Sequence, residues 1–301
     1  MSLPCTRAEA EALKDDIGQF AGLDAPPVLM TSETEGDRWR LDAYFDTEPG
    51  LDDLALLTSL APSAGGAEPT VERLGDQDWV SLSQQGLEPI RAGRFFVHTP
   101  AHRKAVPPDA VTLEIDAGRA FGTGQHETTT GCLLALDRLR TNGAAVANFA
   151  DIGTGTGLLA FAALRLWPAA AGIASDIDPI AVAVAAENGA INRVPTGRGR
   201  GRIELVTAPG LDHLRLRARA PYDLIIANIL ASPLIDLAPA IGAALAPGGR
   251  LILAGLLDRQ ATAVAAAYRR QRLMPWFSVT RGDWPTLVMR KRRLAPSRKR
   301  R

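Results

Sequence analysis

The segment DIGTGTG, residues 151–157, has the residue types and spacing of a loop that holds a ligand through its backbone. Without a Cβ atom, glycines let the backbone turn tightly and approach a ligand closely. A dinucleotide fingerprint needs G-x-G-x-x-G, and neither Gly153 nor Gly155 as the first glycine gives that spacing. The pattern is instead D-x-G-x-G-x-G, in which Asp151 precedes Gly153, Gly155 and Gly157.

This pattern predicts a ligand that carries both a negative and a positive group. The N-terminus of a helix after Gly157 favours an anionic group such as a carboxylate. Asp151 repels a phosphate but pairs with a cation. The methionine part of S-adenosylmethionine has both a carboxylate and an ammonium group. The loop therefore indicates this cofactor, with Asp151 and the three glycines as contacts.

A second acid follows the next expected strand, in the segment SDIDP at residues 175–179. Asp176 lies nineteen residues after Gly157, where a carboxylate that binds ribose is expected in a nucleotide-binding α/β sheet. This position suits NAD as well as S-adenosylmethionine, so the glycine spacing has to separate the two. Ile177 is a further predicted cofactor contact. Asp178 is expected to cap the helix that begins at Pro179.

A carboxamide stands at the end of another expected strand, in ANILASPL at residues 227–234. Ligands bind outside the carboxyl ends of the strands in open α/β sheets. Asn228 offers two donors and an acceptor there. An Asn can also simply close a turn, but at this strand end we predict that it lies beside the reacting centre and the cofactor.

The stretch AFGTGQHETTTGCLLAL, residues 120–136, could be mistaken for a second nucleotide loop. It lacks the GK[ST] ending of a P-loop, one His and one Glu are too few for a metal site, and the chain has no GxSxG motif. We interpret it as one wall of the cofactor pocket. Phe121 would face the cofactor, Thr128 or Thr129 would cap a helix over 130–140, and His126 is a candidate for moving a proton or for positioning.

These residues need a particular scaffold, and the pattern from residue 111 onward predicts it. Near-continuous apolar strands alternate with Ala- and Leu-rich helices, which indicates a mostly parallel sheet covered on both faces. The last two strands have only Arg281-Gly282-Asp283 between them and should be antiparallel. The expected strands are VANFADIG, AAGIASDID, RIELVTA, YDLIIANIL, GRLILAGL, MPWFSVT and PTLVMRK, and the expected helices are 128–140, 157–167, 179–192, 233–246 and 258–272.

The N-terminal residues have a different pattern. A helix over 7–20, two strands within 26–45, a short helix capped near Asp52-Asp53 and a strand at TVERL suggest a small α+β sandwich of ferredoxin-like type. We therefore divide the chain into four parts. They are a small N-terminal domain (1–75), a linker region (76–110), an α/β domain that contains the cofactor loop (111–290) and a basic tail (291–301).

Composition narrows the class of protein further. The chain has 301 residues, 46% hydrophobic and 22% charged, with no apolar run long enough for a membrane span. Two cysteines without a CxxC motif and the absence of a signal-like N-terminus favour a cytoplasmic protein, and no metal site is expected. Residues 290–301 hold eight basic residues and no acid, so the remainder carries +1 − 8 = −7. The tail is predicted to be a solvated, disordered segment or an arm that contacts RNA.

With these motifs in place, the chain resembles the PrmA family of bacterial ribosomal protein L11 methyltransferases over nearly its whole length. The resemblance rests on AFGTGQHETTTGCLLAL, DIGTGTGLLAFAAL, ASDIDPIAV, ANILASPLIDLAP and LAPGGRLILAGLLDRQ. It implies a seven-stranded methyltransferase sheet behind a small domain that recognises the ribosomal protein. It also implies transfer of methyl groups to lysine ε-amines and to the N-terminal α-amine of that protein, by an enzyme expected to be monomeric.

The resemblance also implies roles for single residues. Gly153 matches the glycine of the cofactor loop, Asp176 the ribose-binding acid, and Asn228 the Asn at the methyl-transfer site. Thr129 and Phe121 match cofactor contacts, and His126 matches a histidine near the active site. Departures from the family pattern are Ala117 in place of a proline, a linker with Trp79 but no second tryptophan, and a first strand before residue 7 that is missing or very short. The acid that often faces adenine after the third strand is replaced by Ala208 and Pro209.

Three alternatives remain at this point. The first is a lysine methyltransferase that acts on another protein, such as an electron-transfer flavoprotein subunit. The second is an NAD(P)-dependent oxidoreductase, which the glycine spacing disfavours. The third is a non-catalytic module that binds RNA or the ribosome through the basic tail, which an intact cofactor loop disfavours.

Overall fold

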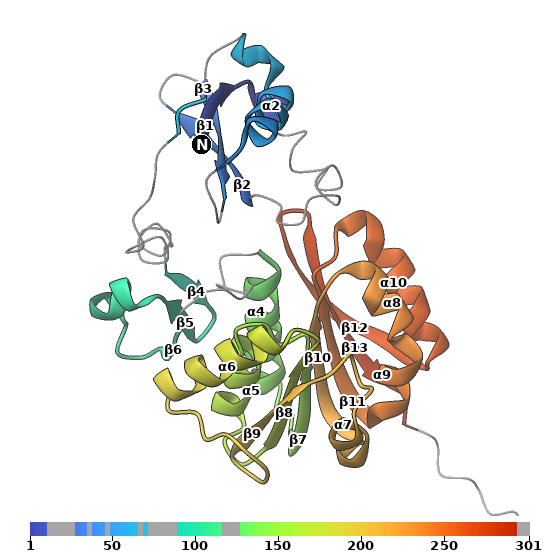
Figure 1. Cartoon of the computed structure of the whole chain (residues 1–301). Helices are drawn as coiled ribbons and strands as arrows, with labels where there is room; N and C mark the ends of the chain where they lie inside the picture. The colour runs from blue at the N-terminus through green and yellow to red at the C-terminus, as the bar shows by residue number, and fades with distance from the viewer. Residues whose placement is uncertain are drawn as a thin grey trace, which may run out of the picture. The chain divides into compact units, whose positions relative to one another are not determined.

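The computed structural model describes residues 1–10, 28–34, 38–45, 49–65, 69–71, 89–115 and 127–293 (Figure 1). The chain divides into two compact units, Met1–Gln77 and Asp78–Arg301. The first unit has one apolar core, and the second has a core on each face of its large sheet. No helix within the described ranges is long and apolar enough to cross a membrane.

The first unit is a small antiparallel sheet with the strand order β1-β3-β2. Thr70 adds an antiparallel bridge to Ser2 in β1. Residues 7–10 are helical, so the described elements follow the β-α-β-β-α-β order of the predicted ferredoxin-like type. The elements are β1 (Ser2–Cys5), β2 (Val28–Thr34), β3 (Arg38–Tyr44), α2 (Leu51–Leu60) and the 3-10 turn η2 (Pro62–Ala64).

The strand expected before residue 7 to be missing or very short is present and short, since β1 has four residues. One local prediction for this unit needs correction. Helix α2 is capped by Gly50 and not by Asp52 or Asp53. The Gly50 N–H donates to Oδ2 of Asp53 at 2.8 Å, so Asp53 supports the cap from inside the first turn. The remainder of the predicted helix 7–20, and residues 72–74 of the predicted strand, lie outside the described residues.

The second unit contains a seven-stranded sheet within the described residues, in the order β12-β13-β11-β10-β7-β8-β9. Strands β11, β10, β7, β8 and β9 run parallel to one another, and β13 is antiparallel to both β11 and β12, as predicted for the last pair. The strands are β7 (Asn148–Ile152), β8 (Ala171–Asp176), β9 (Arg202–Thr207), β10 (Tyr222–Asn228), β11 (Leu245–Ala254), β12 (Leu273–Arg281) and β13 (Trp284–Lys291).

Helices cover both faces of this sheet (Figure 1). One core contains α4 and α5, and the other contains α8, α9 and α10, which agrees with the near-continuous apolar strands between them. The helices are α4 (Glu127–Thr141), α5 (Leu158–Leu166), α6 (Pro179–Ile191), α7 (Leu214–Arg219), α8 (Ala231–Asp236), α9 (Ala238–Ala244) and α10 (Asp258–Arg270). The sequence pattern did not predict α7.

The single helix predicted over 233–246 is wrong, because the structure has two helices there. Helix α8 ends at Asp236 and α9 begins at Ala238, with Leu237 between them. Pro239 lies in the first turn of α9. A proline has no N–H to donate, and its ring clashes with the carbonyl four residues earlier, so one continuous helix would be broken at this point.

A second, smaller sheet in this unit combines residues from the predicted linker and the predicted methyltransferase domain. Strand β5 pairs antiparallel with β4 and parallel with β6. Buried residues of all three strands, such as Phe95 and Leu113, belong to the same core as α4. The elements are β4 (Ile90–Ala92), β5 (Phe95–His98), the 3-10 segment η3 (Pro100–Ala105) and β6 (Val111–Glu114).

The basic run at the C-terminus is not a tail from its first residue. Strand β13 continues to Lys291, and the Arg290 guanidinium lies over the Trp276 ring, 5.8 Å from its centroid. The Lys291 Nζ atom donates to the carbonyl oxygens of Gly242 and Leu245, each at 2.6 Å. Lysine side chains at a helix C-terminus satisfy carbonyls that have no partner within the helix. Residues 294–301 lie outside the described residues.

Replacing Lys291 with Met is expected to lower the free energy of unfolding by about 1–2 kcal/mol, since two carbonyls lose a charged donor. Denaturant unfolding of the purified protein would measure this change. Arg292→Met is the matched control, because Arg292 is exposed and its side chain has no hydrogen bond to any described residue. Equal losses in the two variants would contradict a structural role for Lys291.

Candidate functional site

A cavity of about 700 Å³ lies at the carboxyl ends of β7, β8, β9 and β10. This is the edge where ligands bind in open α/β sheets, and the size suits a cofactor. Most of its walls are apolar. It is lined by Thr128, Thr129, Ile152, Gly153, Thr154, Gly155, Thr156, Leu158, Leu159, Asp176, Ile177, Ala208, Pro209, Gly210, Asn228, Ile229, Leu230, Pro233, Asp236, Leu237, Gly255 and Trp284.

The glycine loop is fastened to the neighbouring strand by its backbone. The N–H groups of Gly153 and Thr154 both donate to the Ser175 carbonyl, at 2.8 and 2.9 Å. Gly153 has φ +71°, and a Cβ atom there would lie 2.2 Å from Cγ2 of Ile229. The predicted need for a glycine at this position is therefore steric as well as conformational.

Asp176 links the glycine loop to the next helix. Its Oδ2 accepts from the Gly155 N–H at 2.8 Å, and its Oδ1 accepts from the Asp178 N–H at 3.1 Å. The carboxylate lines the cavity while these two bonds fix its orientation. Asp178 caps α6 by accepting from the Ile180 N–H at 2.8 Å, as predicted. Ile177 lines the cavity and is 72% exposed, so it offers an apolar surface to a ligand.

Asp151 and Gly157 do not line the cavity, which differs from the predicted direct contacts. Gly157 is the N-cap of α5 with φ +84°, and a Cβ atom there would lie 2.4 Å from Cζ of Phe161. Asp151 is buried beneath the loop, where its Oδ2 accepts from Thr154 Oγ1 at 2.7 Å and from the Ala160 N–H at 3.1 Å. Both residues shape the loop that other residues use.

Burial raises the pKa of the Asp151 carboxyl to about 7. The charge of Asp176 raises it further, and the hydrogen bonds from Thr154 and Ala160 oppose the shift. Its Oδ1 atom has no hydrogen-bond partner in the described structure. A proton on this buried carboxyl removes the cost of an isolated charge.

The pKa of Asp151 predicts a pH-dependent stability. Between the ordinary pKa of 3.8 and about 7, the folded state holds a proton that the unfolded state has released. The free energy of unfolding therefore falls as the pH rises through this interval. Asp151→Asn should remove this contribution, so the variant gains stability relative to the parent from pH 4 to pH 7. Denaturant unfolding of both proteins over this range measures the difference, and parallel curves would contradict the assignment.

Asn228 and Thr129 meet at the base of the cavity. Asn228 Nδ2 donates to Thr129 Oγ1 at 3.4 Å, which connects the end of β10 to α4. No described residue donates to Oδ1 of Asn228. Thr128 and Thr129 lie inside α4 and are buried, so the prediction that one of them caps the helix is wrong. The structure thus brings two predicted cofactor contacts together from residues far apart in the chain.

Several cavity residues carried no signal in the sequence. Leu230 is 72% exposed beside Asn228, and Trp284 reaches the cavity from β13. Asp236 and Leu237 come from the break between α8 and α9, which the helix pattern did not show. Gly255 follows β11, so the rule that ligands bind at strand ends could have indicated it.

Phe121 and His126, with Ala117, lie outside the described residues.

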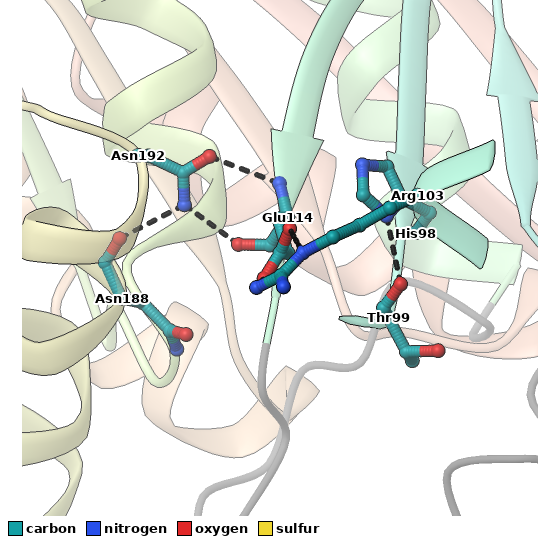
Figure 2. A network of polar contacts seen from close by, with 6 residues as sticks. All are labelled: His98, Thr99, Arg103, Glu114, Asn188 and Asn192. Atoms are coloured by element: carbon teal, nitrogen blue, oxygen red, sulfur yellow. Dashed lines mark hydrogen bonds and ion pairs between the residues drawn. The ribbon is translucent and has the colours of Figure 1, made fainter. Parts of the chain in front are cut away.

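The strand that precedes them, β6, is fixed to α6 by a polar network shown in Figure 2. Asn192 Oδ1 accepts from the Glu114 N–H at 2.9 Å, and Asn192 Nδ2 donates to the Glu114 and Asn188 carbonyls at 2.6 and 2.8 Å. The Glu114 carboxylate forms an ion pair with Arg103. Asn188 Nδ2 also reaches the Thr156 carbonyl at 3.2 Å, so one network connects β6 to the glycine loop.

The order of the strands, the glycine loop on Asp176 and the cavity at the strand ends together define an S-adenosylmethionine-dependent methyltransferase. The residues present fit this cofactor: the cavity is large enough, Gly153 and Gly155 of the glycine loop line it, and a carboxylate stands where ribose hydroxyls bind. No group of three or more metal ligands occurs among the described residues.

Comparison with known proteins identifies the family. The model of the ribosomal protein L11 methyltransferase (PrmA) family matches residues 9–292, and this chain belongs to that family. A ribosomal protein L11 methyltransferase of Brucella suis is 42% identical over 285 residues, which are 94% of this chain and 96% of the relative. One from Agrobacterium fabrum is 41% identical over 289 residues, 95% of this chain and 96% of the relative.

A solved structure supports the same assignment. The crystal structure of the ribosomal protein L11 methylase from Lactobacillus delbrueckii subsp. bulgaricus aligns with a TM-score of 0.57 at 28% identity. The alignment covers 68% of this chain and 100% of the chain in that crystal structure. The family resemblance and the α/β fold with a small N-terminal sheet domain are therefore confirmed.

Proposed function

We propose that this chain transfers methyl groups from S-adenosylmethionine to lysine ε-amines and to the N-terminal α-amine of ribosomal protein L11. The main support is the family match over residues 9–292, together with curated relatives of that name that align over nearly their full length. The cavity supports the chemistry, because Asn228 and Thr129 meet next to the glycine loop. A substrate in an electron-transfer flavoprotein has no support from these relatives.

The amine has to lose its proton before it can attack. A free lysine has a pKa of about 10.4, so at pH 7 the neutral form costs about 4.6 kcal/mol. The bound cofactor supplies an electrophilic methyl group on a sulfonium. Leu230 and Trp284 are among the apolar residues that line the cavity with Asn228, and an apolar environment lowers the pKa of an amine. Desolvation of the amine thereby offsets part of the free energy needed to form its neutral state.

Asn228 is the residue we assign to orienting the amine. Its Nδ2 donates to Thr129, which leaves Oδ1 as the acceptor for an amine N–H. Holding the nitrogen in line with the methyl group lowers the entropy that is lost when the complex reaches the transition state. We assign Gly153, Gly155, Asp176, Ile177 and Thr129 to the cofactor, Phe121 to a contact with it, and His126 to positioning or to proton transfer through water.

The test is methylation of purified L11 with S-adenosylmethionine, followed by mass spectrometry of the product. We expect mass increases in multiples of one methyl group, on lysines and on the N-terminal amine. A lysate from cells that lack this enzyme, incubated with labelled cofactor, shows whether another protein is labelled instead. Label on a flavoprotein band and none on L11 would overturn the proposal.

Asn228→Ala should lower the rate of L11 methylation by about 100-fold, the scale of losing one positioned group at a reacting centre, with little change in cofactor affinity. Single-turnover rates and calorimetric binding of S-adenosylhomocysteine measure these separately. Equal rates for Asn228→Ala and the parent at saturating cofactor would remove the assigned role.

A pH–rate profile of His126→Ala with unchanged shape and height would remove His126 from the proton path.

We further propose that the enzyme works as a monomer in the cytoplasm and that its basic C-terminal residues contact RNA. Residues 294–301 hold four of the eight basic residues of the run, and phosphates attract such segments. Deletion of 294–301 should weaken binding to ribosomal RNA fragments and reduce its salt dependence, while L11 methylation stays unchanged. Filter binding at two salt concentrations tests this, and identical binding with and without the segment would contradict it.

A further inference from the structure

The cavity extends on both sides of Asp176, and its two ends differ in chemistry. Gly153, Thr154, Thr129 and Asn228 line the end at β7 and β10. Ile177 and residues 208–210, which follow β8 and β9, line the other end. With the ribose on Asp176 and the methionine part at the glycine loop, the adenine ring belongs at the second end.

This second end has little polar side-chain chemistry. Ala208 and Pro209 have no side-chain acceptor, and Pro209 also lacks an N–H. Ile177 and Leu237 present apolar atoms that suit the faces of a purine ring. A binding site built only from these residues would hold a purine without recognising the group at its 6-position.

One acid lines the cavity from a different element, directly before a residue that packs at this end. Asp236 is the last residue of α8 and lines the cavity. Its neighbour Leu237 packs against the loop after β9, since a Cβ atom on Gly210 would lie 2.5 Å from Leu237 Cδ2. Among the described residues that line the cavity, Asp176 and Asp236 are the only acids, and both oxygens of Asp176 already accept backbone N–H groups.

Asp236 also makes no interaction of its own within the described structure. It is exposed, and it forms neither a hydrogen bond nor an ion pair with another described residue. A solvated acceptor at the purine end of the cavity is available to a donor on the ligand.

We propose that the Asp236 carboxylate accepts a hydrogen bond from the exocyclic 6-amino group of adenine. It thereby makes the site specific for adenine over a purine with a 6-oxo group. Adenine presents an N–H₂ donor at this position, whereas hypoxanthine presents an acceptor that a carboxylate repels. This inference rests on S-adenosylmethionine as the cofactor. It assigns to α8 the acid that the sequence lacks after the third strand, where Ala208 and Pro209 stand.

The experiment compares two ligands by calorimetry, S-adenosylhomocysteine and its 6-oxo analogue S-inosylhomocysteine. The parent protein should bind the adenine form at least about tenfold more tightly, the scale of one hydrogen bond to a charged group. Asp236→Ala should bring the ratio of the two dissociation constants close to one. Asp236→Asn should favour the 6-oxo analogue relative to the parent, because its amide can donate to the oxo group.

Asp212→Asn is the matched control. Asp212 lies two residues after Gly210, forms an exposed ion pair with Arg217 and does not line the cavity. It loses the same charge near the same loop, so it should keep the discrimination of the parent. Thermal melts of all the variants confirm that they are folded, and the two substitutions at the exposed Asp236 give independent readings.

Discrimination that stays at the parent level in both Asp236 variants would overturn the proposal. Asp236 variants that lose only affinity for L11 would also overturn it, because that result would place the carboxylate at the substrate amine. A parent protein that binds neither ligand would also contradict the cofactor assignment. Binding of the adenine form without any effect of Asp236 would leave that assignment intact and refute only the role of this residue.

Discussion

The site depends on the attachment of the glycine loop to β8. Two N–H groups of the loop share the Ser175 carbonyl, and a third, from Gly155, reaches the Asp176 carboxylate. Backbone N–H groups beyond the end of a strand no longer have partners in the sheet and need others. These hydrogen bonds give the N–H groups of the loop such partners, and they also fix the orientation of the Asp176 carboxylate. The ribose-binding carboxylate and the cradle for the methionine part are thus parts of one hydrogen-bonded unit, so neither has to be ordered when the cofactor binds.

Buried polar groups hold the same unit from below. Asp151 lies under the loop with its hydroxyl and amide partners, and the raised pKa of its carboxyl lets it stay there without an unpaired charge. Asn188 connects the loop to the network of Asn192 and Glu114. Directional hydrogen bonds between buried groups favour one arrangement over its alternatives more strongly than apolar packing does. The cavity itself can then remain mostly apolar and receptive to a ligand.

Much of this architecture follows from residue patterns. The alternation of apolar strands and helices predicted a parallel sheet, the glycine spacing separated one cofactor from another, and Asp178 with Pro179 marked a helix start that the structure has. These predictions worked because each rests on a few neighbouring residues with one dominant physical preference. The single helix over 233–246 failed, because the periodicity is continuous across Leu237 while Pro239 breaks the hydrogen bonds. The predicted strand PTLVMRK correctly included the charged Arg290 and Lys291, whereas the tail predicted over 291–301 began one residue too early.

The sequence by itself determined the class of fold, the cofactor loop and the acids and amide at the strand ends, because the alternation of strands and helices and the chemistry of a loop are local properties. Only the tertiary structure decided which of these residues reach the cavity. Asp151 was expected to face the ligand and lies beneath the loop, whereas Asp236 was not expected and lines the cavity. The direction of a side chain at a loop or a helix end depends on packing against distant residues. For Asp236 that packing is the contact of Leu237 with Gly210.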